Sequence, residues 1–404
     1  MVQDMMDACT GLAAIRHNKK VVTYNFLSIF PTNYVMDNSG PFPQPQLPVV
    51  LGKSFTFSSK KMNIREATKN LMLQIMSWAE SVNLIKDFCP LIERHNLYVA
   101  SDGTCEATLL HMSKNKILNI IFSKLDVQRA HYTNNFFVGS LTPKPAKKLT
   151  STSPSEKRLA DFISSSAEHG FVYISLGTKG SVDFNRLLRI SDALRLLAPI
   201  KAVWKLSMNV EDHERQQLED GGNIFLSDWL PQQDLLGFRE KGHKGILAFL
   251  THCGRHSLEE AAWHGVPIVA MPLFADQPYN ARLSVVHQFG VHVDKYAFTA
   301  SSLAEAFHES ILLAESAQQL STVLRAHPRS PREQAADLIE YALRSDGADF
   351  LRPSEIDLSK FEYYAPFVLV ALYYSRWPLF MVVLCVLLSR VAWRFLPRKQ
   401  IKAE

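Results

Sequence analysis

The sequence predicts an α/β protein whose main domain is a doubly wound parallel sheet. Between residues 171 and 273, short apolar runs alternate with amphipathic segments, as strands alternate with helices in such sheets. The runs "FVYISL" and "GILAFL" are apolar throughout, which is typical of strands buried on both faces. A stretch rich in Pro, Ser, Thr and Lys precedes this region and indicates a linker between two domains.

Length and composition agree with a folded protein of two domains. The 404 residues suffice for two hydrophobic cores, and 47% hydrophobic with 21% charged residues is ordinary for a globular chain. A net charge of +5, without basic runs interleaved with aromatics, does not indicate a nucleic-acid partner. The five cysteines are scattered and form no CxxC pair, so we expect neither a disulfide framework nor a zinc ribbon.

The upstream half mixes strand-like and helical patterns. Residues 1–138 contain the runs "KKVVTYNFLSIF" and "HNLYVAS" and the helical segment "IREATKNLMLQIMSWAESVNLI". We assign 1–138 to a partial N-terminal domain, 139–157 to the linker, 158–345 to the regular domain and 346–362 to a closing segment.

Within the regular domain the expected elements follow in order. Strands are predicted at 171–176, 201–206, 223–230, 245–252 and 267–273, with helices over 184–197, from Ser257 and from about Asn280. Ligands of open α/β sheets bind outside the carboxyl ends of the strands. The loops after the strands are therefore where a site is expected.

The C-terminal region predicts a membrane anchor. Residues 363–393 are apolar apart from Arg376 and Arg390, and are long enough to span a bilayer as a helix. The alternative is a buried core helix. Arg376 and Pro378 favour it, because they lie near the middle of the apolar segment, where a charged residue is costly in a bilayer. Basic residues after the span and acidic ones before it place the tail, 394–404, in the cytosol.

The N-terminus has no basic start followed by an apolar run, so it does not resemble a signal peptide. A body on the lumenal side of a membrane needs an export signal. Either the tail inserts post-translationally, or the chain lacks its natural beginning.

Two strand-end loops suit a nucleotide. "SLGTKG" after the first strand offers Ser175, Thr178 and two glycines, whose backbone N–H groups can approach an anion. A tight turn without a ligand explains it equally well. Trp229 after the third strand offers a face on which a nucleobase can stack, although a core tryptophan is the simpler interpretation of that residue alone.

The fourth strand ends in "THCGRHSLEE", which suggests zinc at first sight. Zinc would need His252 and His256 on one helical face, and Gly254 breaks that face. Ser257 and Glu260 fit a capping box, which predicts a helix N-terminus at Ser257. Such an N-terminus binds anions, and His252 then points at the same anion as a hydrogen-bond donor.

After the fifth strand come Asp276 and Gln277, a carboxylate and an amide that suit vicinal sugar hydroxyls. An aromatic plate, an anion site and a polyol-binding pair together indicate a site for a nucleotide sugar.

At this point the sequence resembles the UDP-glycosyltransferase (UDP-glucuronosyltransferase) family. "WLPQQDLLGFREKGHKGILAFLTHCGRHSLEEAAWHGVPIVAMPLFADQ", 229–277, has the order and spacing of the family signature. "VGS" at 138–140 and "ISLGT" at 174–178 also match it. The resemblance implies a GT-B fold, in which two Rossmann-like domains face a cleft, here with an incomplete N-terminal domain and a C-terminal transmembrane helix.

The resemblance also implies roles at the nucleotide-sugar site. Trp229 would stack on uracil, with Gln232 at the base or ribose and Glu260 on the ribose hydroxyls. His252, Gly254 and Ser257 would hold the diphosphate. Asp276 and Gln277 would bind the transferred sugar, with Ser175 and Thr178 near UDP and sugar.

Two features depart from the family pattern. Many relatives have a small residue in place of Arg255 and Asn in place of His256, and we expect the added cation to be tolerated beside the diphosphate. The family's catalytic histidine lies upstream of the segment that "DMMDACTGLAA" resembles, so this chain is expected to lack it. Asp4, or Asp7 as the fallback, matches the aspartate that orients that histidine.

The function implied is an inverting, metal-independent transfer of glucuronic acid or glucose from a UDP-sugar to a hydroxyl of a small lipophilic acceptor. No cofactor is expected, since the UDP-sugar is a co-substrate. The expected location is the endoplasmic reticulum membrane, with a lumenal body, a single span and possible pairing with family members. The alternative is a non-catalytic truncated isoform that binds UDP-sugar or pairs with full-length relatives.

Overall fold

The computed structural model describes the regular domain almost completely and the upstream half in segments. The described residues are 2–4, 13–14, 16–17, 19, 21–25, 49–51, 54–56, 89–96, 98, 105, 116–126, 134–149, 153–177, 182–207, 210–219, 221–344 and 351. Met1–Arg352 form one unit by their contacts, and Pro353–Glu404 form a second. The predicted span at 363–393 lies outside the described residues, and no helix within them is long and apolar enough to cross a bilayer.

A six-stranded parallel sheet is the centre of the regular domain. Its strands are β7 (Phe171–Ser175), β8 (Lys201–Lys205), β9 (Ile224–Ser227), β10 (Ile246–Thr251), β11 (Ile268–Ala270) and β12 (Gly290–His292). Their order in the sheet is β12-β11-β10-β7-β8-β9, and all neighbours are parallel. Numbered within the domain this is 3-2-1-4-5-6, the Rossmann order, which confirms the doubly wound sheet.

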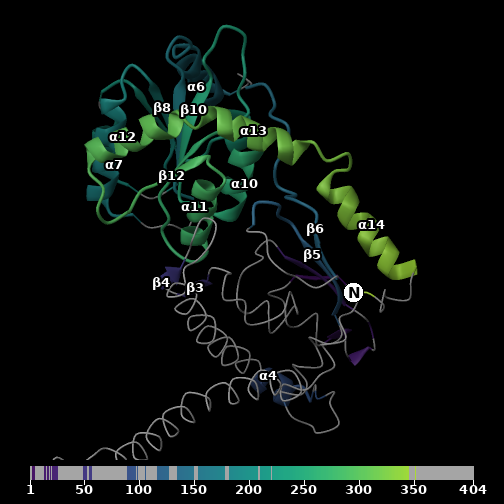
Figure 1. Ribbon diagram of the computed structural model, residues 1–404. Helices are drawn as coiled ribbons and strands as arrows, with labels where there is room; N and C mark the ends of the chain where they lie inside the picture. Colours follow the sequence, from purple (N-terminus) through teal and green to yellow (C-terminus); the bar gives the residue numbers. More distant parts are fainter. Residues whose placement is uncertain are drawn as a thin grey trace, which may run out of the picture. The chain divides into compact units, whose positions relative to one another are not determined.

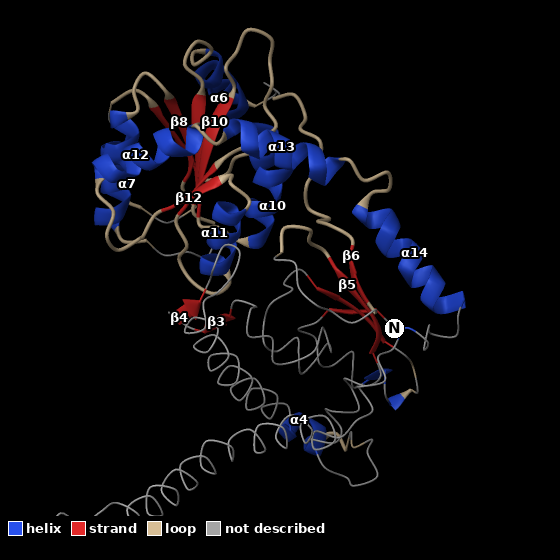
Figure 2. Cartoon of the chain, viewed as in Figure 1, coloured by secondary structure: helices blue, strands red, loops and turns tan. Residues whose placement is uncertain are grey.

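Helices cover both faces of this sheet (Figure 2). They are α6 (Pro154–Ser164), α7 (Phe184–Leu196), α8 (Asp212–Glu219), α9 (Gln232–Leu236), α10 (Arg255–His264), α11 (Gln277–Val286), α12 (Ala300–Ile311) and α13 (Ala314–Arg325). Alternate residues of β7 enter opposite cores. Val172 and Ile174 pack with α7 and α12, while Phe171 and Tyr173 pack with α6, α10 and α13. The continuous apolar pattern of β7 follows from burial on both sides.

The upstream half contributes a second parallel sheet, ordered β1-β2-β5-β6. Its strands are β1 (Val2–Asp4), β2 (Val21–Asn25), β5 (Lys116–Ile121) and β6 (Asn135–Phe137). The described residues of this half also include β3 (Val49–Leu51), β4 (Ser54–Thr56) and α4 (Cys89–Arg94). Helix α14 (Pro331–Arg344) packs on this sheet, since Ala335 and Ala342 share a core with Leu118 and Ile120 (Figure 1).

The predicted linker is attached to the regular domain along part of its length. Gln233 on α9 donates through Nε2 to the Thr142 carbonyl at 2.9 Å, and the Lys147 amide donates to Asp234 Oδ1 at 2.7 Å. Its last residues already belong to α6, which Ser153 and Glu156 begin with a capping box. A Pro-rich composition therefore marks an extended segment here, fixed by side chains of α9.

One expectation about the cysteines is wrong. Cys89 and Cys105 form a disulfide, with their Cα atoms 5.5 Å apart. The bond joins residues 16 positions apart, and no short motif in the sequence marks that pairing. Cys253 is a free, fully buried thiol, as its place at the end of an apolar strand suggests.

Candidate functional site

The site lies where the strand order of the six-stranded sheet reverses. β7 and β10 are adjacent parallel strands, and Ser175 is the register partner of Thr251 at their carboxyl ends. Helices leave these two strands on opposite faces, which opens a crevice between the following loops. Ser175 and His252 therefore lie at the same edge of the sheet, and the side chain of Ser175 is buried there.

The ring of His252 sits between two glycines. A Cβ on Gly177 would lie 2.7 Å from His252 Nε2, and a Cβ on Gly254 would lie 2.6 Å from the same atom. Gly177 also has φ +81°, a conformation that favours glycine. Both glycines are thus required by the closeness of the imidazole.

The imidazole of His252 is poised to meet an anion. Its buried Nδ1 has no hydrogen-bond partner among the described residues. Burial lowers the pKa of His252, partly offset by the Ser175 backbone and Asp276. The ring is therefore neutral near pH 7, and an anionic ligand would both satisfy it and stabilise its protonated form.

Helix α10 begins next to this ring without a side-chain cap. Its first residue is Arg255 and its N-cap is Gly254, two to three residues earlier than the sequence predicts. The expected capping box is wrong, because Ser257 lies inside the helix and Glu260 bonds elsewhere. The amides of the first turn lie at the positive end of the helix dipole, where no earlier carbonyl of the same helix can accept from them.

Gln232, Ser257 and Glu260 are brought together behind this turn. Gln232 Nε2 donates to Glu260 Oε2 at 2.7 Å and to Ser257 Oγ at 3.1 Å, while its Oε1 accepts from the Tyr173 hydroxyl at 3.3 Å. Gln233 Nε2 donates to the other carboxylate oxygen of Glu260 at 3.2 Å. Burial raises the pKa of Glu260, while the Gln232 hydrogen bond lowers it.

Trp229 is exposed at the rim of the same edge. It follows β9 by two residues and leaves 69% of its surface open to solvent. The Ser227 hydroxyl donates to the Trp229 carbonyl at 2.9 Å and fixes the turn. The core interpretation of this tryptophan is wrong, and an exposed indole at a strand end is available for stacking.

Asp276 and Gln277 differ in which side-chain oxygens are already hydrogen-bonded within the protein. Asp276 is the N-cap residue of α11 and accepts from Asn280 Nδ2 at 2.6 Å through Oδ2. Gln277 is buried, and its Oε1 accepts from the amides of Leu273 at 2.8 Å and Phe274 at 3.0 Å. The carbonyl of Gln277 thus shapes the loop, and α11 begins at Gln277 rather than near Asn280.

Arg255 does not face the crevice, contrary to the expectation of a cation beside an anionic ligand. Its side chain is buried and forms ion pairs with Asp126 at 3.0 Å and with Glu259 at 2.9 Å. His256 is exposed on the first turn of α10. The sequence gives no sign of the partner, since Asp126 lies 129 residues away.

Two predicted residues remain beyond description. Thr178 lies outside the described residues, as does the fallback Asp7. The backbone of Asp4 ends β1, and its side chain is not described. No group of three His, Cys, Asp or Glu side chains within the described segments is placed to hold a metal ion.

Sequence reasoning missed two residues that organise the site, Tyr173 and Asn280. Asn280 had a usable signal, because it stands four residues after Asp276, the spacing of neighbours on a helix. Tyr173 read only as an apolar strand residue, although its hydroxyl reaches Gln232.

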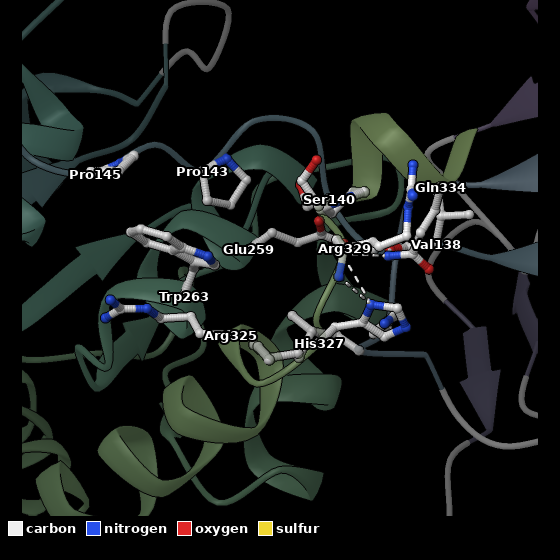
Figure 3. A pocket seen from close by; sticks show the side chains of 16 residues that line it. Val138, Ser140, Pro143, Pro145, Glu259, Trp263, Arg325, His327, Arg329 and Gln334 are labelled. Atoms are coloured by element: carbon white, nitrogen blue, oxygen red, sulfur yellow. Dashed lines mark hydrogen bonds between the residues drawn. The ribbon is translucent and has the colours of Figure 1, made fainter. Parts of the chain in front are cut away.

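A second cavity, of about 390 Å³, lies beside the back of α10 (Figure 3). Glu259 and Trp263 of α10 contribute to its wall, with Ser140 and Pro143 of the linker opposite. Arg325 lies over the Trp263 ring, 4.7 Å from its centroid. None of the predicted site residues lines this cavity.

The chain matches known proteins over most of its length. Residues 1–401 match the family model described as "UDP-glucoronosyl and UDP-glucosyl transferase". UDP-glucuronosyltransferase 2A1 of Mus musculus is 31% identical over 347 residues, 84% of this chain and 60% of that protein. UDP-glucuronosyltransferase 2B1 of Rattus norvegicus is 33% identical over 334 residues, 80% of this chain and 57% of that protein. The chain thus spans about 60% of the length of the curated relatives it matches.

Solved structures agree in fold. The glycotransferase of kitacinnamycin superposes with a TM-score of 0.55 at 18% identity, covering 84% of this chain and 75% of that one. A UDP-glucose: anthocyanidin 3-O-glucosyltransferase in complex with UDP gives 0.54 at 16% identity, covering 85% and 75%. With the two parallel sheets, these likenesses establish the α/β GT-B fold.

Proposed function

The chain belongs to the UDP-glucoronosyl and UDP-glucosyl transferase family, and from this premise we propose that it binds a UDP-sugar at the β7–β10 edge and transfers the sugar to an acceptor. The observation that carries the proposal is the pairing of His252 with the uncapped N-terminus of α10. A buried ring nitrogen without a described partner and the uncapped first turn of α10 meet at one strand end. Backbone amides donate hydrogen bonds, and so does Nδ1 of His252 when it carries the ring proton, which suits a diphosphate.

Each further residue has a place in this proposal. The exposed indole of Trp229 stacks on uracil, and Glu260, held by Gln232 and Gln233, accepts from the ribose hydroxyls. Asp276 accepts from hydroxyls of the transferred sugar through the oxygen that Asn280 leaves free. Since its carbonyl is engaged, Gln277 contributes only its NH₂ group.

The proposed reaction is an inverting displacement without a metal ion. The acceptor oxygen attacks the anomeric carbon, its proton passes to a base, and the bond to the UDP oxygen breaks. His252 and the α10 amides stabilise the charge that grows on the departing diphosphate, the task that a metal ion performs elsewhere. Asp4 is the residue we propose to orient a histidine base, and the described residues assign no such base.

The sugar is glucuronic acid or glucose, and the acceptor is a small lipophilic molecule with a hydroxyl. The relatives are UDP-glucuronosyltransferases by name, and one similar structure acts on anthocyanidin with UDP-glucose. No cofactor takes part in this scheme, because the UDP-sugar is consumed as a substrate.

We also propose that residues 363–393 anchor the chain in the endoplasmic reticulum membrane, with a lumenal body and a cytosolic tail. The Cys89–Cys105 disulfide supports an oxidising compartment. Resistance of the chain to alkaline extraction from microsomes, and protection of its body from added protease, test this arrangement. Pairing with a second copy or with family members is part of the same proposal.

Calorimetry with UDP tests the donor site directly. His252→Ala should weaken UDP binding by about 10–100-fold, the value of a hydrogen bond to a charged group. His213→Ala, on the exposed side of α8, is the matched control and should leave affinity unchanged. Wild-type protein that does not bind UDP would overturn the proposal.

The second candidate function is UDP-sugar binding without transfer. It is favoured because Gln232, Ser257 and Glu260, proposed here for UDP, come together in the described part of the chain, which assigns no histidine to the role of base. Turnover of UDP-glucuronic acid or UDP-glucose with a phenolic acceptor decides between the two. Turnover that Asp276→Ala abolishes supports transfer, and tight UDP binding with no turnover supports the second candidate.

A further inference from the structure

Arg255 uses every nitrogen of its guanidinium in a buried network. Nε donates to Glu259 Oε1 at 2.9 Å and Nη1 donates to Asn280 Oδ1 at 3.2 Å. Nη2 donates to Asp126 Oδ2 at 3.0 Å and to the Ser123 hydroxyl. Burial alone lowers the pKa of Arg255, but the carboxylates of Asp126 and Glu259 raise it above its usual value. Four of the five N–H donors of this buried cation are thus engaged with protein groups.

One arm of the network reaches the upstream half of the chain. Asp126 follows β5 of the four-stranded sheet, and its Oδ1 accepts from the Tyr279 hydroxyl on α11 at 3.3 Å. Leu125 beside it belongs to the core of the regular domain, and its carbonyl lies 2.6 Å from His287 Nε2. The segment after β5 is thus fixed against α10 and α11.

The other arm reaches the proposed sugar site through Asn280. Its Nδ2 donates to Asp276 Oδ2 at 2.6 Å and to the Cys253 carbonyl at 3.0 Å. Cys253 is the residue after His252 and has φ +62°, a strained conformation for a side chain with a Cβ. One amide therefore holds both a sugar-binding carboxylate and the turn that carries the phosphate-binding histidine.

Arg255 supports that amide from the side of its oxygen. A guanidinium can only donate, so the oxygen of Asn280 must face it. The NH₂ group then faces Asp276 and the Cys253 carbonyl, which can only accept. Without Arg255 the oxygen of Asn280 loses its donor, and only the two bonds of the NH₂ group, to Asp276 and to the Cys253 carbonyl, still hold the amide.

We infer that Arg255 is a positioning residue: through the amide of Asn280 it sets Asp276 for the donor sugar, and through Asp126 it ties this setting to the segment after β5. The inference rests on the proposed function, since it assigns Asp276 to the sugar. Glu259 lines the second cavity (Figure 3) and forms an ion pair with Arg255, which offsets the positive charge of the guanidinium.

The test measures, by calorimetry, the affinity of the 404-residue chain for UDP, UDP-glucuronic acid and UDP-glucose. A structural role affects all ligands alike, whereas a misplaced Asp276 affects only ligands that carry a sugar. Arg255→Lys retains a buried cation, but its single nitrogen cannot replace the three nitrogens with which Arg255 binds four partners. The ratio of the UDP-sugar Kd to the UDP Kd should rise by about 3–10-fold, within the range of measured couplings between contacting residues.

A double-mutant cycle shows whether the effect passes through Asp276. In an Asp276→Asn background, Arg255→Lys should change the ratio by less than about twofold, because the coupled carboxylate is already lost. Arg329→Lys is the matched control, since it alters an exposed ion pair with Asp337, and it should leave the ratio unchanged.

A second variant keeps the test decisive if Arg255→Lys folds poorly. Asp126→Asn has no contact with Asp276, yet it should raise the same ratio by about twofold to threefold by loosening Arg255. Equal losses of UDP and UDP-sugar affinity, or full additivity with Asp276→Asn, overturn the inference while leaving the UDP site intact. A wild-type chain that binds no UDP overturns the proposed function, and the inference with it.

Discussion

Helices α10 and α12 begin in opposite ways. α12 starts with a capping box, in which the Thr299 side chain accepts from the Ser302 amide at 3.1 Å and the Thr299 amide donates back to Ser302 at 2.9 Å. α10 starts at Gly254 with no side-chain cap, and its first residue, Arg255, turns into a buried ion-pair network. In α12 the start of the helix stabilises itself. In α10 no side chain caps the first turn, and the ion pairs of Arg255 with Asp126 and Glu259 hold the start of the helix instead.

The largest effect on stability should come from replacing Arg255, whose ion pairs hold the start of α10 in place of a side-chain cap. Arg255→Met leaves Asp126 and Glu259 buried without their cation, which should cost about 3–5 kcal/mol of the free energy of unfolding. Urea denaturation followed by circular dichroism measures it. The triple change Arg255→Met, Asp126→Asn, Glu259→Gln should recover most of the loss. A single variant as stable as wild type would show that α10 needs no such support.

The next effect separates ligand binding from stability. Gly254→Ala places a Cβ 2.6 Å from His252 Nε2, so the ring must move away from the α10 amides. We expect UDP affinity to fall by about 10-fold or more, as when a hydrogen bond to a charged group is lost. The backbone of Gly254 has φ −56°, which alanine adopts, so the free energy of unfolding should change little. A change in stability with unaltered affinity would contradict the division of tasks between Gly254 and Arg255.

The α12 cap supplies the converse case. Thr299→Ala removes one partner of the capping box and should cost about 1 kcal/mol of the free energy of unfolding. UDP affinity should not change, since α12 packs on α7 and on β10, β11 and β12, in the core on the other face of the sheet from α10. Any loss of UDP binding in this variant would mean that the two helix starts are not independent.

The smallest effect is a pH dependence carried by buried histidines. Burial lowers the pKa of His252, and burial with the nearby Arg239 and Arg325 lowers that of His264 to about 4. Below the ordinary pKa of about 6.5 the unfolded chain takes up protons that the folded chain refuses, so stability falls as pH drops from 6.5 towards 4.

Measuring the melting temperature at a series of pH values between 6.5 and 4 gives the slope of stability against pH. His264→Asn should flatten it, and so should saturating UDP, because a bound diphosphate favours protonated His252. A slope of the opposite sign would show that these rings gain, rather than lose, proton affinity on folding.

The sequence predicts the sheet better than the contacts at its edge. Unbroken apolar runs predict β7 and β10, and the position of Gly254 directly after a strand predicts a turn. These features can be predicted because they depend on neighbouring residues alone. β12 is three residues long and escapes any periodic pattern. The capping box failed for a related reason: Ser257 and Glu260 have the right spacing, but Gln232, 28 residues from Glu260, takes the carboxylate.

The roles of charged residues were the least predictable. From the sequence, Arg255 was predicted to lie beside the diphosphate, because its neighbours on the chain line the crevice. Its orientation is set by Asp126 and Asn280, which stand 129 and 25 residues away. Trp229 was assigned to stacking by resemblance, and its 69% exposure agrees with that role without testing it. Local patterns thus locate the site, while long-range partners decide which atoms are free within it.

The position of α14 has a consequence for how the protein is made. Ala335 and Ala342 complete the core of the four-stranded sheet, and Gln334 donates to the Val138 carbonyl across 196 residues. At ~5–20 residues per second, the ribosome needs roughly 10–40 s to make the chain between those contacts. During that interval the apolar surface of the first sheet has no α14 to cover it. The half of the molecule that is synthesised first is therefore finished last, and chaperones would find their binding surface there.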